Sequence, residues 1–234
     1  MVKKYIWGSE TDFHSFIDSI SEKDRIGIVT HTDVDGIVSA IFLQKILESR
    51  KLNIEFIEFL DHGANVLKNI LNKEFDILFF TDWIVDDYLE DFDELRKKGK
   101  VFVIDHHPIN ERLKDKKRII KTDYSYCSAH CLFDLSGNYF DTKPWEWLVC
   151  SAIVSDYVWD KADENFEFIK KVYPDVKKDA SIWDFEPGKI ARLIKGASIY
   201  YSNLQVVYDL VLRKDLKKLE KANKVISKEV NKWI

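Results

Sequence analysis

The sequence predicts an α/β fold, in which a largely parallel five-stranded sheet is flanked by helices and followed by a helical C-terminal region. Short apolar segments alternate with helical patterns over the first half of the chain, which is typical of βαβ units. From Ser128 onward the pattern is almost wholly helical. We therefore expect residues 1–160 to form an α/β domain and residues 161–234 to form a helical region.

The first elements are a helix and a buried strand. Residues 12–20 place Phe13, Phe16 and further apolar residues at helical spacing. Residues 26–30 (IGIVT) are a short apolar run and predict the first strand. The glycine of HTDVDG, Gly36, then permits a tight turn into a helix, whose inner face would be supplied by apolar residues up to Leu47.

The same alternation continues to residue 121. Strands are predicted at 54–60, 76–80, 101–104 and 118–121, and helices between them at 64–71 and 89–98. Gly99 is suited to end the second of these helices. Right-handed crossovers would place the helices on both faces of the sheet. Further helices are predicted at 129–135, 145–158, 165–172, 189–200, 203–211 and 215–233.

Composition narrows the range of functions. The chain of 234 residues is 46% hydrophobic and has a net charge of −4, so it is no general polyanion binder. Contact with nucleic acid would need a local basic patch or bound metal ions. Three cysteines without a CxxC pair fit a reducing compartment. No apolar run predicts a signal peptide or a membrane span, so we expect a cytoplasmic protein that does not bind membranes.

Polar side chains suited to binding metal follow three of the predicted strands. They are His31, Asp33 and Asp35 after the first strand, Asp82 after the third, and Asp105, His106 and His107 after the fourth. In open α/β sheets, ligands bind at the carboxyl ends of the strands. Asp156, which closes the apolar run SAIVSD, would need a cation or a hydrogen bond if it is buried.

The residue types indicate which metal would bind. Carboxylate oxygens with imidazole nitrogens, and no thiolate, suit Mn²⁺ or Mg²⁺ better than structural zinc. Two ions about 3.5–4 Å apart need a bridging carboxylate and several further ligands. His31, Asp33, Asp35, Asp82, His106 and Asp156 would nearly complete that set.

Each motif also has a structural explanation. An isolated Asp after a strand, such as Asp82, is commonly a helix cap or turn residue, and HTDVDG alone fits a solvated turn. Cys127 and Cys131 of CSAHC lack a further zinc ligand nearby and are interpreted as core residues. The basic stretch 213–232 fits a solvated amphipathic helix; a flank that guides nucleic acid or an intersubunit helix are the alternatives. His14 and His62 have no sequence partner and are interpreted as surface or incidental residues.

Four motifs, in order, resemble those of the DHH phosphoesterase superfamily, named for its Asp-His-His motif. They are HTDVDG (31–36), Asp82 in FFTDW, VIDHH (103–107) and SAIVSDY (151–157). The His-x-Asp form of the first motif is similar to archaeal RecJ-like members. Superfamily members include RecJ-type exonucleases, oligoribonucleases, cyclic-dinucleotide phosphodiesterases and manganese-dependent pyrophosphatases.

The resemblance implies a role for each residue. His31, Asp33, Asp35, Asp82, His106 and Asp156 would bind two Mn²⁺ ions, with Mg²⁺ as a substitute. Asp82 would bridge the ions, with Asp156 as a second bridging candidate. His107 would contact the substrate phosphate and act in catalysis, and Asp105 would orient the histidines. Residues 1–160 would then be the catalytic domain.

The function that follows is manganese-dependent hydrolysis of single-stranded RNA or DNA, or of short oligonucleotides, in an exonuclease-like manner. One alternative is a pyrophosphatase-like enzyme for small phosphoanhydrides or phosphoesters. Another is a non-catalytic scaffold with this fold in a replication or repair complex. The sequence is also compatible with a homodimer. Many relatives carry a glycine-rich substrate domain after the catalytic one. The stretch after Asp156 holds only Gly188 and Gly196, so no such domain is recognised.

Overall fold

Six strands form one sheet in the part of the chain described by this computed structural model, which comprises residues 4–108, 110–113 and 118–230. The strands are β1 (Tyr5–Trp7), β2 (Ile26–His31), β3 (Ile54–Leu60), β4 (Ile77–Thr81), β5 (Lys100–Asp105) and β6 (Ile119–Thr122). Their order is β1-β6-β5-β4-β2-β3, and only β1 is antiparallel to its neighbour. The predicted α/β fold with a largely parallel sheet is confirmed. The predicted number of strands was one too low, because β1 has three residues and too little pattern to be recognised.

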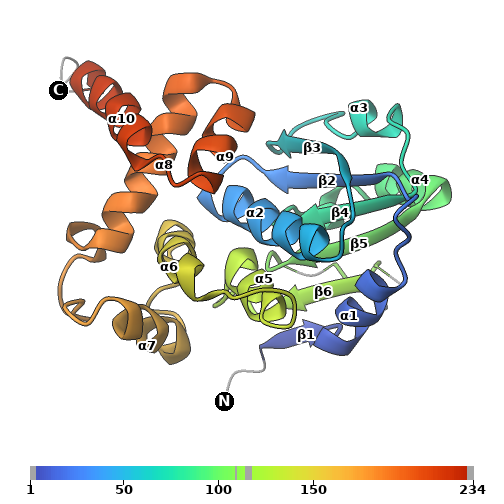
Figure 1. Cartoon of the computed structure of the whole chain (residues 1–234). Coiled ribbons are helices and arrows are strands. Elements are labelled where there is room, and N and C mark those ends of the chain that lie inside the picture. Colours follow the sequence, from blue (N-terminus) through green and yellow to red (C-terminus); the bar gives the residue numbers. More distant parts are fainter. Residues whose placement is uncertain (1–3, 109, 114–117, 231–234) are drawn as a thin grey trace.

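The register of the parallel strands aligns their carboxyl ends. Thr30 of β2 pairs with Thr81 of β4, and Thr81 pairs with Ile104 of β5. The chain runs from β2 outward to the edge strand β3 and returns to β4 on the other side of β2. The strand order therefore reverses between β2 and β4, which is where open α/β sheets form their binding crevice. The arrows of the parallel strands point toward the helical part of the chain (Figure 1).

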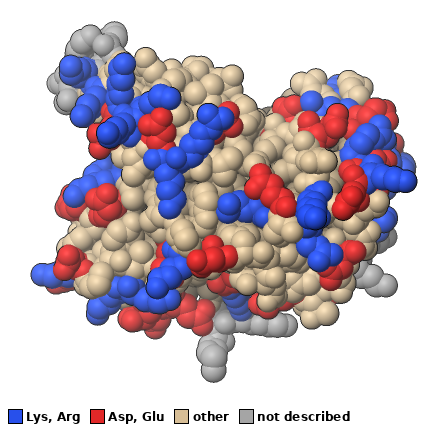
Figure 2. Space-filling model, in the orientation of Figure 1, with Lys and Arg blue, Asp and Glu red and all other residues tan. Residues whose placement is uncertain are grey.

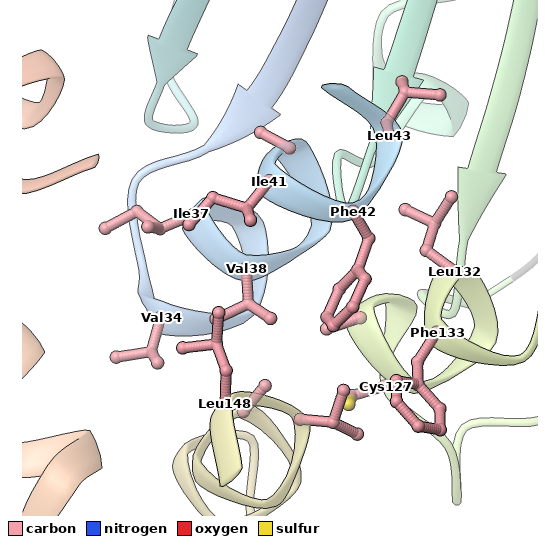
Figure 3. Packing of buried hydrophobic residues seen from close by; sticks show 14 of the residues in the cluster. Val34, Ile37, Val38, Ile41, Phe42, Leu43, Cys127, Leu132, Phe133 and Leu148 are labelled. Carbon is pink, nitrogen blue, oxygen red and sulfur yellow. The ribbon is translucent and has the colours of Figure 1, made fainter. Parts of the chain in front are cut away.

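Helices cover both faces of the sheet. Helices α1 (Glu10–Asp18), α2 (Val34–Ser49) and α5 (Ser128–Ser136) contribute to one hydrophobic cluster, and α3 (Lys68–Leu71) and α4 (Leu89–Lys98) contribute to the other. Helix α2 is buried on several sides, because it packs on the sheet and also against α5 and α6 (Glu146–Ser155). Figure 3 shows its apolar side chains meeting Phe133 of α5 and Leu148 of α6.

The second half of the described chain is helical, as predicted. After α6 it contains α7 (Asp163–Val172), α8 (Glu186–Tyr201), α9 (Leu204–Leu212) and α10 (Leu216–Val230). Helix α10 packs closely on α8, since a Cβ added at Gly196 of α8 would lie 2.2 Å from Asn223 Oδ1 of α10. Lys and Arg side chains gather over α10 at the top left of Figure 2. Residues 231–233 of the predicted last helix lie outside the described residues.

Short 3₁₀ turns connect several elements: η1 (Val85–Asp87), η3 (Lys143–Trp145) and η4 (Ile182–Asp184). The helix predicted at 64–71 is reduced to α3, because turns occupy its first half and Asn65 adopts a positive φ of 64°. Cys127, Cys131 and Cys150 are buried free thiols, which confirms the core interpretation of CSAHC. No helix of the described chain is long and apolar enough to cross a membrane. The division at residue 160 stays a prediction.

Candidate metal centre

Three neighbouring strands bring polar side chains to one point on the sheet edge. Because Thr30, Thr81 and Ile104 are in register, the residues that follow them are adjacent: His31 at the end of β2, Asp82 just after β4, and Asp105 at the end of β5. Asp82 has a positive φ of 52°, a left-handed conformation that Asp tolerates better than most residues. Backbone conformations of this kind concentrate at functional sites.

Helix α2 begins at this edge and supplies two carboxylates. Asp33 is its N-cap and accepts a 2.9 Å hydrogen bond from the Gly36 amide. Gly36 is required here, because a Cβ would lie 2.3 Å from the His31 carbonyl oxygen. Asp35 is fully buried, and its two oxygens accept 2.9 Å hydrogen bonds from the Ser128 and Ala129 amides. The amino end of α5 thus stabilises the Asp35 carboxylate.

His106 and Asp156 complete the cluster. Asp156 is the C-cap of α6, which carries its carboxylate to the sheet edge. His106 Nε2 lies 3.3 Å from Asp82 Oδ1, 3.5 Å from Asp156 Oδ2 and 4.0 Å from Asp35 Oδ2. On the other side of Asp82, His31 Nδ1 lies 2.9 Å from Asp33 Oδ2 and 4.0 Å from Asp82 Oδ2. We call His31, Asp33, Asp35, Asp82, His106 and Asp156 the acidic cluster.

The cluster and its neighbour His107 form three overlapping groups of candidate ligands, each with its ligand atoms within 4.8 Å of one another. The groups are His31, Asp33 and Asp82; Asp82, His106 and His107; and Asp35, His106 and Asp156. Asp82 and His106 each belong to two groups. The fold therefore brings together the six residues predicted as ligands. His107, predicted to contact the phosphate, lies close to two of them, Asp82 and His106. Their individual roles stay predictions.

The carboxylates of the cluster are poorly compensated by the protein itself. Burial, followed by the charges of Asp35 and Asp33, raises the pKa of Asp82 well above its usual value. The same causes raise the pKa of Asp156 to about 9. Asp82 Oδ2 and Asp156 Oδ2 are buried without a hydrogen-bond partner among the described residues. Burial also opposes the charge on Asp33, but the His31 imidazole and the Gly36 amide lower its pKa to about 2.

A second group of buried charges lies on the β6 side of β5. Lys121 Nζ of β6 is 2.5 Å from Asp86 Oδ2 and 2.6 Å from Asp105 Oδ2, and all three residues are buried. Asp105 Oδ1 is 2.7 Å from His107 Nδ1. Burial alone would raise the pKa of Asp105, but the Lys121 charge and the His107 hydrogen bond hold it below its usual range. We call Lys121, Asp86, Asp105 and His107 the Lys121 network.

The sequence reasoning missed several residues of this region. His62, interpreted as a surface or incidental residue, is exposed, but it stacks on the His31 ring with centroids 4.9 Å apart and meets the His107 ring edge-on at 6.0 Å. Asp61 Oδ1 lies 3.6 Å from His31 Nε2. Lys121 and Asp86 belong to none of the motifs recognised in the sequence. A lone histidine after a strand gives no signal in a sequence, although its position after β3 follows the same strand-end rule as His31.

The residues fit hard divalent cations. The donors are carboxylate oxygens and imidazole nitrogens, a set that suits Mn²⁺ or Mg²⁺. Buried acids without a protein cation, and buried polar atoms without partners, are expected where a positive ion is to bind. A cavity of about 590 Å³ opens beside the cluster and is lined by Asp33 and Asp156 as well as by residues of α8.

Comparison with known proteins agrees with this geometry. Residues 25–139 match the family model described as "DHH family, N-terminal domain". A search of curated proteins found no matching sequence. Among solved structures, the chain is similar to exonuclease RecJ bound to manganese, with a TM-score of 0.67 at 14% identity over 94% of this chain and 64% of that one.

Two further structures share the fold. RecJ from Thermus thermophilus in complex with Mn²⁺ gives a TM-score of 0.63 at 15% identity, over 94% of this chain and 37% of that one. CDC45 from Entamoeba histolytica gives 0.52 at 14% identity, over 100% of this chain and 58% of that one. The chain thus spans less than two thirds of these proteins. At such identities the likeness concerns the fold alone.

Proposed function

Because the chain belongs through residues 25–139 to the DHH phosphoesterase superfamily, we propose that it is a metal-dependent phosphodiesterase. It would hydrolyse single-stranded RNA or DNA, or short oligonucleotides, and remove nucleotides from one end. The observation that carries this proposal is the acidic cluster. Asp82 is buried and Asp156 half-buried among other carboxylates at the carboxyl edge of the sheet, and the described chain places no lysine or arginine in ion-pair contact with either.

The acidic cluster would hold two divalent cations, Mn²⁺ or less effectively Mg²⁺. Asp82 belongs to two of the three ligand groups and is the natural residue to be shared between ions. When bound, such ions supply a nucleophile at neutral pH and neutralise charge on phosphoryl oxygens. Because burial and neighbouring carboxylates raise the pKa of Asp82 and Asp156, a bound cation would favour the ionised form of both groups.

His107 is suited to act on the substrate. Its Nδ1 is committed to Asp105 Oδ1 at 2.7 Å, and Asp105 is fixed in turn by Lys121. This arrangement sets the imidazole orientation and leaves Nε2 to face a phosphoryl oxygen. The imidazole would stabilise the charge that develops there, or pass a proton to the leaving oxygen.

Two other functions are compatible with the same fold. A pyrophosphatase-like enzyme would use the same cluster on a smaller substrate. A scaffold for a replication or repair complex would need no catalysis, and the fold is shared by RecJ and by CDC45, so it does not decide between them. The retained ligand set favours an enzyme over a scaffold.

A substrate panel with defined metals tests the proposal. End-labelled single-stranded RNA and DNA, dinucleotides and pyrophosphate are incubated with Mn²⁺, with Mg²⁺ or with chelator, and Asp82→Asn serves as the inactive control. We expect hydrolysis of the single strands with Mn²⁺ and none in chelator. Hydrolysis of pyrophosphate alone would support the pyrophosphatase alternative. No hydrolysis of any substrate would support the scaffold.

A further inference from the structure

A second cavity adjoins the one beside the acidic cluster, on the side of α8. The first, of about 590 Å³, runs from Asp33 and Asp156 to Lys195 of α8. The second, of about 230 Å³, is lined by Trp183 and Arg192. Ser155, Tyr157 and Lys195 line both cavities. The two hollows therefore share one wall and form a groove that leads away from the candidate metal centre.

The groove combines one exposed and one partly buried aromatic ring with exposed positive charge. Tyr157 is 62% exposed, and its ring centroid lies 5.7 Å from that of Trp183 at an interplanar angle of 60°. Tyr157 directly follows Asp156 and has a positive φ of 57°, an unusual conformation for a bulky residue. The backbone thus holds the ring at the mouth of the groove, next to a candidate ligand.

Lys195 is exposed, and no carboxylate of the described residues forms an ion pair with it. Arg192 lies one turn earlier on α8, and its Nη2 donates a 2.6 Å hydrogen bond to the Trp183 carbonyl oxygen. This bond ties the aromatic end of the groove to α8. Both cavities are thus lined by an ammonium group without an ion-pair partner among the described residues and by an aromatic side chain, a combination that binds a sugar–phosphate chain while its bases stack.

The remaining lining distinguishes this groove from a site for a small inorganic anion. The wall of the first cavity includes the apolar side chains of Val34, Ile199 and Leu204 and one described basic residue, Lys195. A bare pyrophosphate carries several negative charges and has no apolar surface, so it would gain little from such a wall. A nucleotide has both an anionic and an apolar part.

We propose that this groove binds the strand of a single-stranded nucleic acid next to the cleaved linkage, with Lys195 on a backbone phosphate and Tyr157 stacked on a base. The inference rests on the proposed function for its substrate class, and it adds a binding role for the C-terminal helices. It implies preference for oligonucleotides over pyrophosphate, and tolerance of DNA and RNA alike, because stacking and phosphate contact do not read the base sequence.

Binding measured without turnover tests the groove separately from catalysis. Fluorescence anisotropy of labelled single-stranded DNA and RNA is recorded in chelator, and in Mn²⁺ with a phosphorothioate-linked strand, at several salt concentrations. Lys195→Gln is expected to weaken binding and to reduce the slope of log affinity against log salt by about 0.7, the contribution of one phosphate contact on a single strand. Tyr157→Ala is expected to weaken binding about 10-fold, and Tyr157→Phe to restore it.

Matched controls come from the same helix. Lys189 is an exposed lysine of α8 that lines neither cavity, so Lys189→Gln changes the net charge equally but should leave the salt slope near that of the parent protein. Thermal unfolding of each variant shows whether it is folded. Equal effects of Lys195→Gln and Lys189→Gln would overturn the proposal, as would a Tyr157→Phe variant as weak as Tyr157→Ala.

Failure of the groove and failure of the proposed function give different results. Strand binding that depends on Lys195 and Tyr157, without hydrolysis in Mn²⁺, would support the groove and contradict the enzyme. Hydrolysis of single strands by a protein whose binding ignores both residues would support the enzyme and contradict the groove. Competition for the labelled strand by pyrophosphate, but not by an unlabelled dinucleotide, would also overturn the groove.

Discussion

Two groups of buried acids flank the carboxyl end of β5, and they are neutralised in different ways. On the β6 side, Lys121 lies between Asp86 and Asp105 and compensates their charge. On the β4 side, Asp82 and Asp156 both lie close to His106 Nε2. The Oδ2 atom of each is buried without a hydrogen-bond partner among the described residues. The pKa of Asp105 is accordingly held below its usual range, whereas that of Asp82 is raised well above it.

The difference separates a structural use of buried charge from a functional one. Where the chain supplies the cation, the charges fix geometry: the Lys121 network orients His107 through Asp105. Where the described residues supply no lysine or arginine, the folded protein carries an electrostatic cost that an external cation would lower. Five predictions test this contrast, in order of decreasing expected effect.

Removing the carboxylate of Asp82 should have the largest effect. Asp82→Ala is expected to abolish hydrolysis, with a loss beyond about 10⁴-fold, because two ligand groups share this residue. Metal stoichiometry is measured beside the rate and should fall with it. Hydrolysis at the parental rate with a full complement of metal would show that Asp82 is only a turn residue.

His107 should behave differently, although it lies within the same reach. His107→Ala is expected to lower turnover about 10²–10⁴-fold, since charge stabilisation or proton transfer is lost, while metal still binds. Asp105→Asn should be milder than Asp82→Ala, because Asp105 acts through His107. If His107→Ala lost metal as completely as Asp82→Ala, His107 would be a ligand and the division of roles would be wrong.

Removing the cation of the Lys121 network should destabilise the fold. Lys121→Met leaves Asp86 and Asp105 buried without the cation that they share, and we expect a loss of about 3–5 kcal/mol in the free energy of unfolding. Denaturant unfolding measures this loss. The exposed pair of Lys97 and Glu94 offers a matched control, since Lys97→Met should change stability by less than about 1 kcal/mol. Equal effects at both positions would remove the contrast between buried and exposed charge.

The acidic cluster could be predicted from the sequence, whereas the Lys121 network could not, because the two depend on the fold in different ways. His31, Asp82 and Asp105 follow apolar strands, and parallel strands bring their ends together whatever the rest of the fold does. Lys121 lies inside a strand, where a lysine normally points to solvent. Its burial depends on the contact of its ammonium group with the Asp86 carboxylate, which η1 supplies. His62 likewise reaches the site only through the position of β3 beside β2.

Similar reasoning accounts for the secondary structure. The strands from β2 to β6 and the helices from α5 to α10 were placed to within a few residues, because their apolar patterns are long or strongly periodic. Strand β1 was not predicted, because it has only three residues and its partner strand, β6, lies far away in the sequence. The groove along α8 was not foreseen, since it depends on how α6 and α8 pack.

Adding metal should stabilise the parent protein and leave the Asp82 variant almost unchanged. At a Mn²⁺ concentration about 100 times the dissociation constant, the free energy of unfolding should rise by about 2.7 kcal/mol. Asp82→Asn should lose most of this gain. In chelator the same variant should be at least as stable as the parent, because it removes one buried charge from the acidic cluster. Lower stability of Asp82→Asn in chelator would mean that the protein already compensates this carboxylate.

The smallest expected effect comes from a buried histidine outside both groups. His130 of α5 is buried, and its Nδ1 lies 3.0 Å from Asn165 Oδ1. Burial and the nearby Lys4 charge lower its pKa to about 4, against about 6.5 in the unfolded chain. Between these two pKa values, the His130 imidazole is protonated in the unfolded state but not in the folded state. The free energy of unfolding therefore falls as the pH drops from about 6.5 to about 4.

The expected loss is about 2 kcal/mol at pH 5 relative to pH 7.5, measured by denaturant unfolding in chelator. His130→Gln keeps a polar side chain opposite Asn165 but cannot titrate, so its stability should depend less on pH over this range. This variant also isolates the contribution of the two acid groups, because whatever acid dependence remains cannot come from His130. If parent and variant lost stability equally between pH 6.5 and pH 5, the loss would belong to other titrating groups, and His130 would be protonated in the folded protein as readily as in the unfolded chain.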